Sequence, residues 1–169
     1  MEQDEDAVRC LALPIVGEQI LVPNAVVAEV YAPHAVSDAT GGPDWLLGSV
    51  IWRTSVLPLV CMEAAMGGTR LEAGVRSKVV VMKALSASES LKNFAILVQG
   101  IPHQVLATGH SVTLETPING ARPFVALDLQ IEGEQAFIPD MDAVEKALLD
   151  VVDQWQVTES ADGDRDDIS

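Results

Sequence analysis

The chain has 169 residues and a mass near 18.0 kDa, which predicts one domain or two small subdomains sharing a core. Hydrophobic residues make up 49% of it, enough for a packed interior and too many for a largely disordered chain. Its formal net charge is -15, so it gains no counterion-release energy on DNA, which excludes nucleic acid as a partner and disfavours anionic membrane surfaces.

The negative charge is concentrated at the two ends of the chain. Residues 2–6 contain four acids, and residues 140–169 contain ten acids and two bases. We therefore expect an acidic extension over residues 1–7, a folded body over residues 8–155 and an acidic disordered tail over residues 156–169. The chain has no basic leader and no apolar run approaching ~20 residues, so we expect a cytoplasmic protein that does not insert directly into a membrane.

The first third of the chain predicts β-structure. An apolar run over residues 8–16 and a second over residues 20–22 flank Gly17-Glu18-Gln19, which is typical of a hairpin. Asn24 can cap a short helical turn over residues 25–29. Residues 32–44 are rich in Pro, Gly, Ser and Asp and predict a loop.

The middle of the chain continues this pattern. Residues 45–60 predict one or two strands with a turn near Arg53-Thr54, followed by a short helix over residues 61–66. Residues 78–85 predict a strand, and their three consecutive valines indicate burial on both faces.

The last third predicts more strands and one long helix. Strands are expected over residues 93–98, 104–108, 124–131 and 135–138. Apolar residues at helical spacing predict a helix over residues 140–155 with Asp140 as its N-cap. The pattern favours a mainly all-β architecture over a doubly wound sheet, and leaves open two small barrels or one sandwich.

Few residues suggest catalysis or metal binding. Cys10 and Cys61 are far apart in the sequence and have no metal-ligand spacing, so we expect reduced, buried thiols. The histidines His34, His103 and His110 are scattered, and no GxSxG or HxH motif occurs. The run Asp162, Asp164, Asp166 lacks the glutamate that an EF-hand loop requires. We therefore expect no catalysis, no metal and no cofactor.

One segment carries a more specific pattern. Residues 43–62, PDWLLGSVIWRTSVLPLVCM, resemble the corresponding segment of the CheW-like chemotaxis coupling (adaptor) family. The stretches Leu11–Val30, Lys92–Ala107 and 136–149 are also similar to that family, so the resemblance covers about residues 8–155. Thr54, Ile51, Cys61 and Gln99 depart from its usual residues. Within the family the chain most resembles the ChpC-type adaptors of pilus-linked chemosensory systems, which serve twitching motility.

The resemblance implies an architecture and a function without catalysis. The architecture is mainly all-β, with two intertwined five-stranded SH3-like barrel subdomains, short helices and a C-terminal helix. The function is that of a scaffold in two-component signal transduction, at the periphery of receptor arrays. It couples the regulatory domain of a CheA-like histidine kinase to the cytoplasmic tip of a methyl-accepting chemoreceptor.

The resemblance also implies two sets of site residues. The receptor-binding set is Val27, Glu29, Gly48 and Arg53, and apolar edges near Val50, Val56 and Leu57 are expected to bind the kinase. Arg53 also stands out without the family, because a lone arginine in an apolar run must face solvent or find a carboxylate. Alternatively, these residues have ordinary structural roles, for example Val27 in the core and Gly48 in a turn.

A second hypothesis comes from a different class of protein. The chain would then be a small β-barrel enzyme or ligand-binding protein with a pocket between its subdomains. A deep pocket lined by histidines and carboxylates would favour this hypothesis, whereas retention on a histidine kinase would favour the adaptor.

Overall fold

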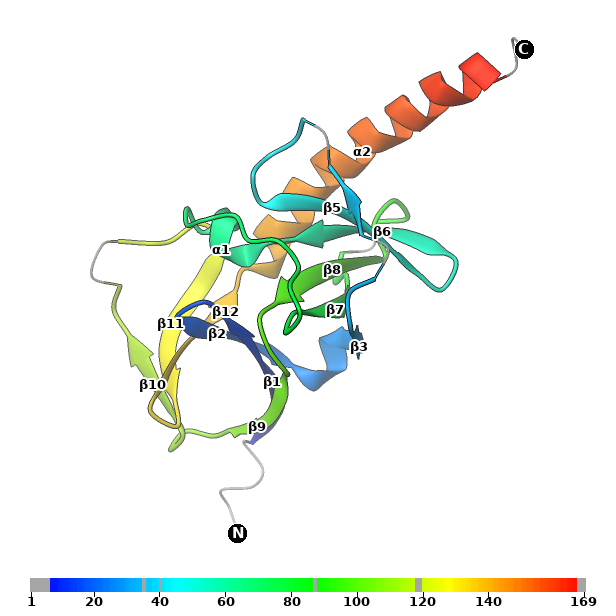
Figure 1. The fold of residues 1–169 in the computed structure, drawn as a ribbon. Helices are drawn as coiled ribbons and strands as arrows, with labels where there is room; N and C mark the ends of the chain where they lie inside the picture. Colours follow the sequence, from blue (N-terminus) through cyan, green and yellow to red (C-terminus); the bar gives the residue numbers. More distant parts are fainter. Residues whose placement is uncertain (1–6, 35, 40, 87, 118–119, 167–169) are drawn as a thin grey trace.

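The computed structural model describes residues 7–34, 36–39, 41–86, 88–117 and 120–166, with side chains described as far as residue 153. Figure 1 shows two β subdomains, with a helix that starts against them and then leads away. The elements, in chain order, are β1 (Val8–Ile15), β2 (Glu18–Pro23), η1 (Asn24–Val26), β3 (Val27–Tyr31), β4 (Ser37–Asp38), β5 (Leu46–Trp52), β6 (Ser55–Val60), α1 (Met62–Ala65), β7 (Lys78–Lys83), β8 (Asn93–Val98), β9 (His103–Ala107), β10 (Val112–Glu115), β11 (Val125–Ile131), β12 (Glu134–Pro139) and α2 (Met141–Asp166).

The strands form two sheets of six, each of which we call a barrel because it curls around its own apolar interior. Barrel A has the strand order β10-β11-β12-β2-β1-β9, and barrel B has the order β3-β7-β8-β6-β5-β4. The N-terminal hairpin β1–β2 thus belongs to the barrel built from the last strands of the chain, through the parallel pair β12–β2. The mainly β, two-subdomain prediction is confirmed, with six strands in each sheet where five were expected.

Three apolar clusters account for the packing. One fills barrel A with small residues such as Ala12 and Ala136, and a second fills barrel B. The largest lies where the two barrels and α2 meet. The three consecutive valines of β7 alternate as expected, because Val79 and Val81 point into barrel B while Val80 points into the shared cluster.

The helical turn expected over residues 25–29 is wrong. A single 3-10 turn covers Asn24–Val26, and Val27–Tyr31 is strand β3, which pairs antiparallel with β7. Asn24 makes no side-chain capping bond, because the N-cap position is Pro23. The β-branched residues Val26, Val27 and Val30 favour a strand, and pairing with β7 overrides the local helical signal.

Two short strands were not expected from the sequence. β4 lies inside the segment 32–44 that predicted a loop, and β10 lies in a stretch for which no element was predicted. Both are short edge strands whose residues are exposed or half-buried, so neither has the apolar run that predicts a strand.

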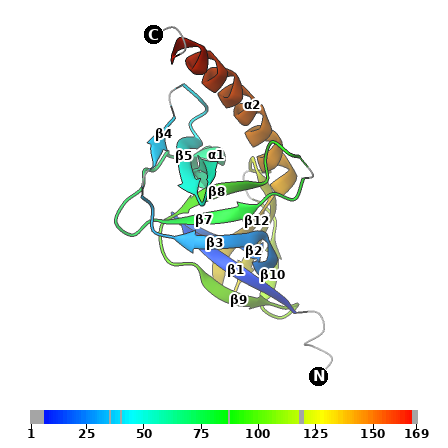
Figure 2. The ribbon, with the colours of Figure 1, turned by 90° about the vertical axis from the view of Figure 1, so that its right-hand side faces the viewer.

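Helix α2 begins as predicted and runs further than predicted. The Ala143 N–H donates to Asp140 Oδ1 at 3.1 Å, which confirms Asp140 as the N-cap. Val144 and Leu148 are buried in the shared cluster, which confirms the apolar stripe. The helical backbone continues past residue 155 to Asp166, since no proline interrupts it, and Figures 1 and 2 show it leading away from both barrels.

The limits of the terminal segments remain predictions. Residues 1–6 and the side chain of Trp155 lie outside the described part of the chain. No helix within the described residues has the length and apolar character that crossing a membrane requires.

Candidate partner-binding surface

The β5–β6 hairpin carries the arginine that the sequence singles out. Trp52 pairs with Ser55, so Arg53 and Thr54 form a two-residue turn, as predicted. Arg53 adopts a φ of 55°, a left-handed conformation that favours glycine, and its side chain is exposed. The guanidinium is thus held at the tip of the hairpin, outside the apolar interior.

Trp52 joins Arg53 to Glu29. The indole Nε1–H of Trp52 donates a hydrogen bond to Glu29 Oε2, and Arg53 Cζ lies 4.5 Å from the centroid of the Trp52 ring. Strands β3 and β5 are not neighbours in the sheet, so this contact exists only because barrel B curls. We call Glu29, Trp52 and Arg53 the indole cluster.

The two charged side chains of the indole cluster form no salt bridge among the described residues. Both salt bridges found among the described residues are made by Arg122, and neither involves Glu29 or Arg53. The charge of Glu29 is felt by Tyr31 on the same strand: burial, and after it this carboxylate, raises the pKa of the Tyr31 hydroxyl. A carboxylate and a guanidinium are therefore both available to a partner at this surface.

The other two expected receptor-binding residues have structural environments. Gly48 is buried in β5, opposite Asp38 of β4, and Val27 is half-buried against the cluster between the barrels. The structure thus brings Glu29 and Arg53 together through Trp52, whereas Gly48 and Val27 contribute backbone and packing.

Two of the three residues expected to bind a kinase point inward. Val50 is 1% exposed and Leu57 is 4% exposed, and both belong to the interior of barrel B. Val56 is 58% exposed, and its cross-strand neighbour Ile51, which the sequence reasoning missed, is 60% exposed. Strand alternation explains the difference, since consecutive residues face opposite sides of a sheet.

A groove lies beside Val56. It has a volume of about 220 Å³ and is bounded by β6, the segment 89–93 and Val152 of α2. Glu89 and Lys92 place charges of both signs on its rim. An exposed apolar pair beside a charged groove is the composition expected of a protein interface.

A second cavity is organised by Arg122, which the sequence did not single out. Arg122 Nη1 and Nη2 donate to Glu18 Oε2 and Oε1 at 2.6 and 2.9 Å, and Nη2 also donates to Asp128. The hydrogen bonds that Arg122 donates to Glu18, ahead of other causes, raise the pKa of the Arg122 guanidinium. The cavity has a volume of about 580 Å³, and no histidine is among the described residues that line it.

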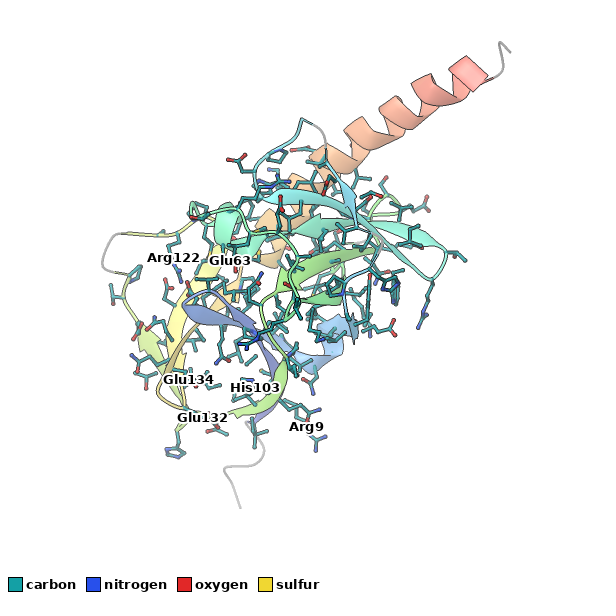
Figure 3. All side chains as sticks on the ribbon, in the orientation of Figure 1. Arg9, Glu63, His103, Arg122, Glu132 and Glu134 are labelled. Carbon is teal, nitrogen blue, oxygen red and sulfur yellow. The ribbon has the colours of Figure 1, made fainter. Side chains whose placement is uncertain are left out.

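The buried carboxylate of Glu63 lies close to this region, as Figure 3 shows beside Arg122. Its Oε2 accepts from the Val16 N–H at 3.2 Å, and its Oε1 lies 3.6 Å from Cys61 Sγ. Burial raises the pKa of the Cys61 thiol, so the thiol is neutral at physiological pH. Sequence could not pair these groups, because Glu63 and Val16 are 47 residues apart. Their contacts hold α1 against the β1–β2 turn.

Metal-ligating side chains do not converge in the described part of the chain. No group of three or more His, Cys, Asp or Glu side chains there is arranged to hold a metal ion. Asp162, Asp164 and Asp166 lie beyond residue 153, the last residue whose side chain the structure describes.

The fold is a pair of β-barrels that share one core, and barrel B carries an exposed, charged hairpin. The CheW-like domain family model matches residues 9–147, and the chain therefore belongs to that family, whose members are scaffolds of chemotaxis signal transduction rather than enzymes. The fold is similar to that of the scaffolding protein TtCheW from Thermoanaerobacter tengcongensis, with a TM-score of 0.64 and 13% identity over 79% of this chain and 88% of that one. None of the curated proteins searched matches this sequence.

Proposed function

We propose that this protein is an adaptor that couples the regulatory domain of a histidine kinase to the cytoplasmic tip of a methyl-accepting chemoreceptor. It works in the cytoplasm at receptor arrays, as a ChpC-type adaptor of a pilus-linked system. The observation that carries the proposal is the exposed Arg53 guanidinium at the hairpin tip, supported by the Trp52 ring and beside Glu29. Such a pair of unneutralised charges fixes the register of a partner.

The kinase is proposed to bind the other face of the same hairpin. Ile51 and Val56 point away from the interior of barrel B, whereas Trp52 packs against it, so the hairpin offers two distinct faces. The apolar contact with the kinase is therefore assigned to the exposed residues Val56 and Ile51, and not to Val50 and Leu57, which are buried. An exposed β-branched pair next to a mixed-charge rim suits another β-barrel of similar composition.

The receptor half is tested by Arg53→Glu, with Arg76→Glu as an exposed charge-reversal control. Arg53→Glu keeps a non-glycine residue at a left-handed position, so the melting temperature is expected to stay within a few degrees of wild type. Affinity for a soluble receptor-tip fragment should fall at least tenfold, because a partner carboxylate would meet a like charge. Titration calorimetry measures this. Unchanged receptor affinity in a folded Arg53→Glu protein contradicts the proposed receptor surface.

The kinase half is tested by Val56→Asp on β6, with Val75→Asp as a control at a fully exposed valine in a loop. We expect Val56→Asp to abolish measurable binding of the kinase regulatory domain and to leave receptor-tip binding intact, since a carboxylate would be desolvated in the apolar contact. Retention of kinase binding by Val56→Asp would place the kinase contact elsewhere.

A further inference from the structure

We propose that Trp52 is a positioning residue for receptor binding, which presents the Glu29 carboxylate and the Arg53 guanidinium as one preformed pair. The inference rests on the proposed function and extends it to a residue outside the expected binding set. Its basis is that a single indole contacts both charged groups through different parts of the ring.

The two contacts are compatible because they use different atoms. The edge Nε1–H of Trp52 donates to Glu29 Oε2, whereas the π-face of the ring lies beneath the guanidinium of Arg53. The indole itself is anchored, since it packs against the apolar interior of barrel B. A rigid ring therefore holds two long, flexible side chains that would otherwise move independently.

The indole also keeps the opposite charges from neutralising one another. Glu29 and Arg53 form no ion pair with each other in the described structure. The indole N–H satisfies one oxygen of Glu29, and no hydrogen bond found among the described residues reaches Oε1. Each charge thus keeps its capacity for a partner, at a lower entropic cost of binding than for free side chains.

This arrangement specifies the chemistry of the partner surface. It should offer a carboxylate to Arg53 and, a short distance away, an N–H donor or a cation to Glu29 Oε1. A partner with only one of these groups would gain little from the preformed pair.

The contact itself is tested without a partner, on the full chain. In a ¹H–¹⁵N spectrum, the indole resonance that disappears in Trp52→Phe is that of Trp52. Glu29→Gln should shift this resonance, because the acceptor loses its charge, whereas Glu132→Gln, on the β11–β12 turn, should leave it in place. A Trp52 resonance that is indifferent to Glu29→Gln overturns the inference.

The role in binding is tested with two variants of graded severity and the soluble receptor-tip fragment as probe. Trp52→Phe keeps an aromatic face and loses the donor, so affinity should fall roughly tenfold. Trp52→Leu also loses the face and should weaken binding by roughly a further twofold to fivefold. Trp45→Phe is the control, since Trp45 packs edge-on against Phe124 and not against the indole cluster.

Additivity separates positioning from general destabilisation. The loss of receptor affinity caused by Trp52→Phe should be smaller in a Glu29→Ala background than in the wild type, because Glu29→Ala has already removed the acceptor of the indole hydrogen bond. If wild type binds the fragment and both Trp52 variants bind equally well, the inference is wrong and the proposed function stands. If wild type does not bind, both are wrong. If Trp52→Leu fails to fold, Trp52→Phe decides.

Discussion

At the scale of single residues, Gly48 shows how a closely approaching backbone can require glycine at one position. Its φ is 151°, and a Cβ built there would lie 1.8 Å from the carbonyl oxygen of Ser37. β4 pairs antiparallel with β5 at this point, with Asp38 opposite Gly48. Only glycine permits so close an approach, so the position is required by the fold whatever partner binds nearby.

Gly48→Ala is therefore expected to destabilise the protein. The unfavourable φ costs about 1–3 kcal/mol, and the clash with Ser37 displaces β4 in addition. Urea unfolding followed by circular dichroism measures the loss.

Gly109→Ala is the matched control for this substitution. Gly109 has no atom within 4 Å of its Cβ position, so its unfolding free energy should stay within about 1 kcal/mol of wild type. Equal stability of the two variants would contradict the close approach of the Ser37 carbonyl to Gly48.

The residue scale also shows what sequence can and cannot predict about a site. The exposure of Arg53 followed from the cost of burying a lone charge, and the turn position is confirmed. The inward orientation of Val50 and Leu57 could not be predicted, because the sequence does not show which alternate residues of each strand face the interior. The Trp52–Glu29 contact required the curl of barrel B, which no local pattern encodes.

At the scale of elements, helix α2 is the part that sequence predicted most directly. Its signals are local in the sequence: an apolar period of 3.6 residues, a proline before the start and an aspartate cap. The cap is confirmed by its hydrogen bond, and the apolar period is confirmed by the burial of Val144 and Leu148. The turn expected over residues 25–29 failed for the opposite reason, because its conformation is decided by β7, about fifty residues away.

Leu148→Ala is expected to cost about 2–5 kcal/mol of unfolding free energy, because Leu148 is fully buried where α2 meets both barrels. Chemical denaturation measures this loss, provided that the variant and the wild type have the same m-value. Lys146→Ala, on the exposed side of the same helix, should change stability by no more than about 0.5 kcal/mol. A silent Leu148→Ala would mean that α2 does not pack as described.

At the scale of the whole molecule, the two barrels share one core, and barrel A is built from both ends of the chain. The pattern of short strands and turns predicted a mainly β fold, but could not assign β1–β2 to the barrel formed by the last strands. That assignment depends on the parallel pairing of β12 with β2, more than a hundred residues apart. The ion pair between Arg122 and Glu18, which are 104 residues apart, also joins β2 to the segment before β11.

Truncation after Val157 is expected to leave the melting temperature within a few degrees of wild type. The backbone of α2 beyond this point leads away from both barrels, and the removed sequence is acidic with almost no apolar residues. Differential scanning calorimetry compares the two proteins. A loss of more than a few degrees would show that the tail packs on the body.

The assembly of barrel A from both ends of the chain also sets an order of events during synthesis on the ribosome. Barrel B uses only strands between residues 27 and 98, so its last partner, β8, emerges while the chain is still growing. The β1–β2 hairpin is made first but waits for β9 and for β12, which ends at Pro139. The side of the hairpin that faces the interior of barrel A therefore stays uncovered until those strands are made, and we expect this long-range pairing to make the completion of barrel A the slow step of folding.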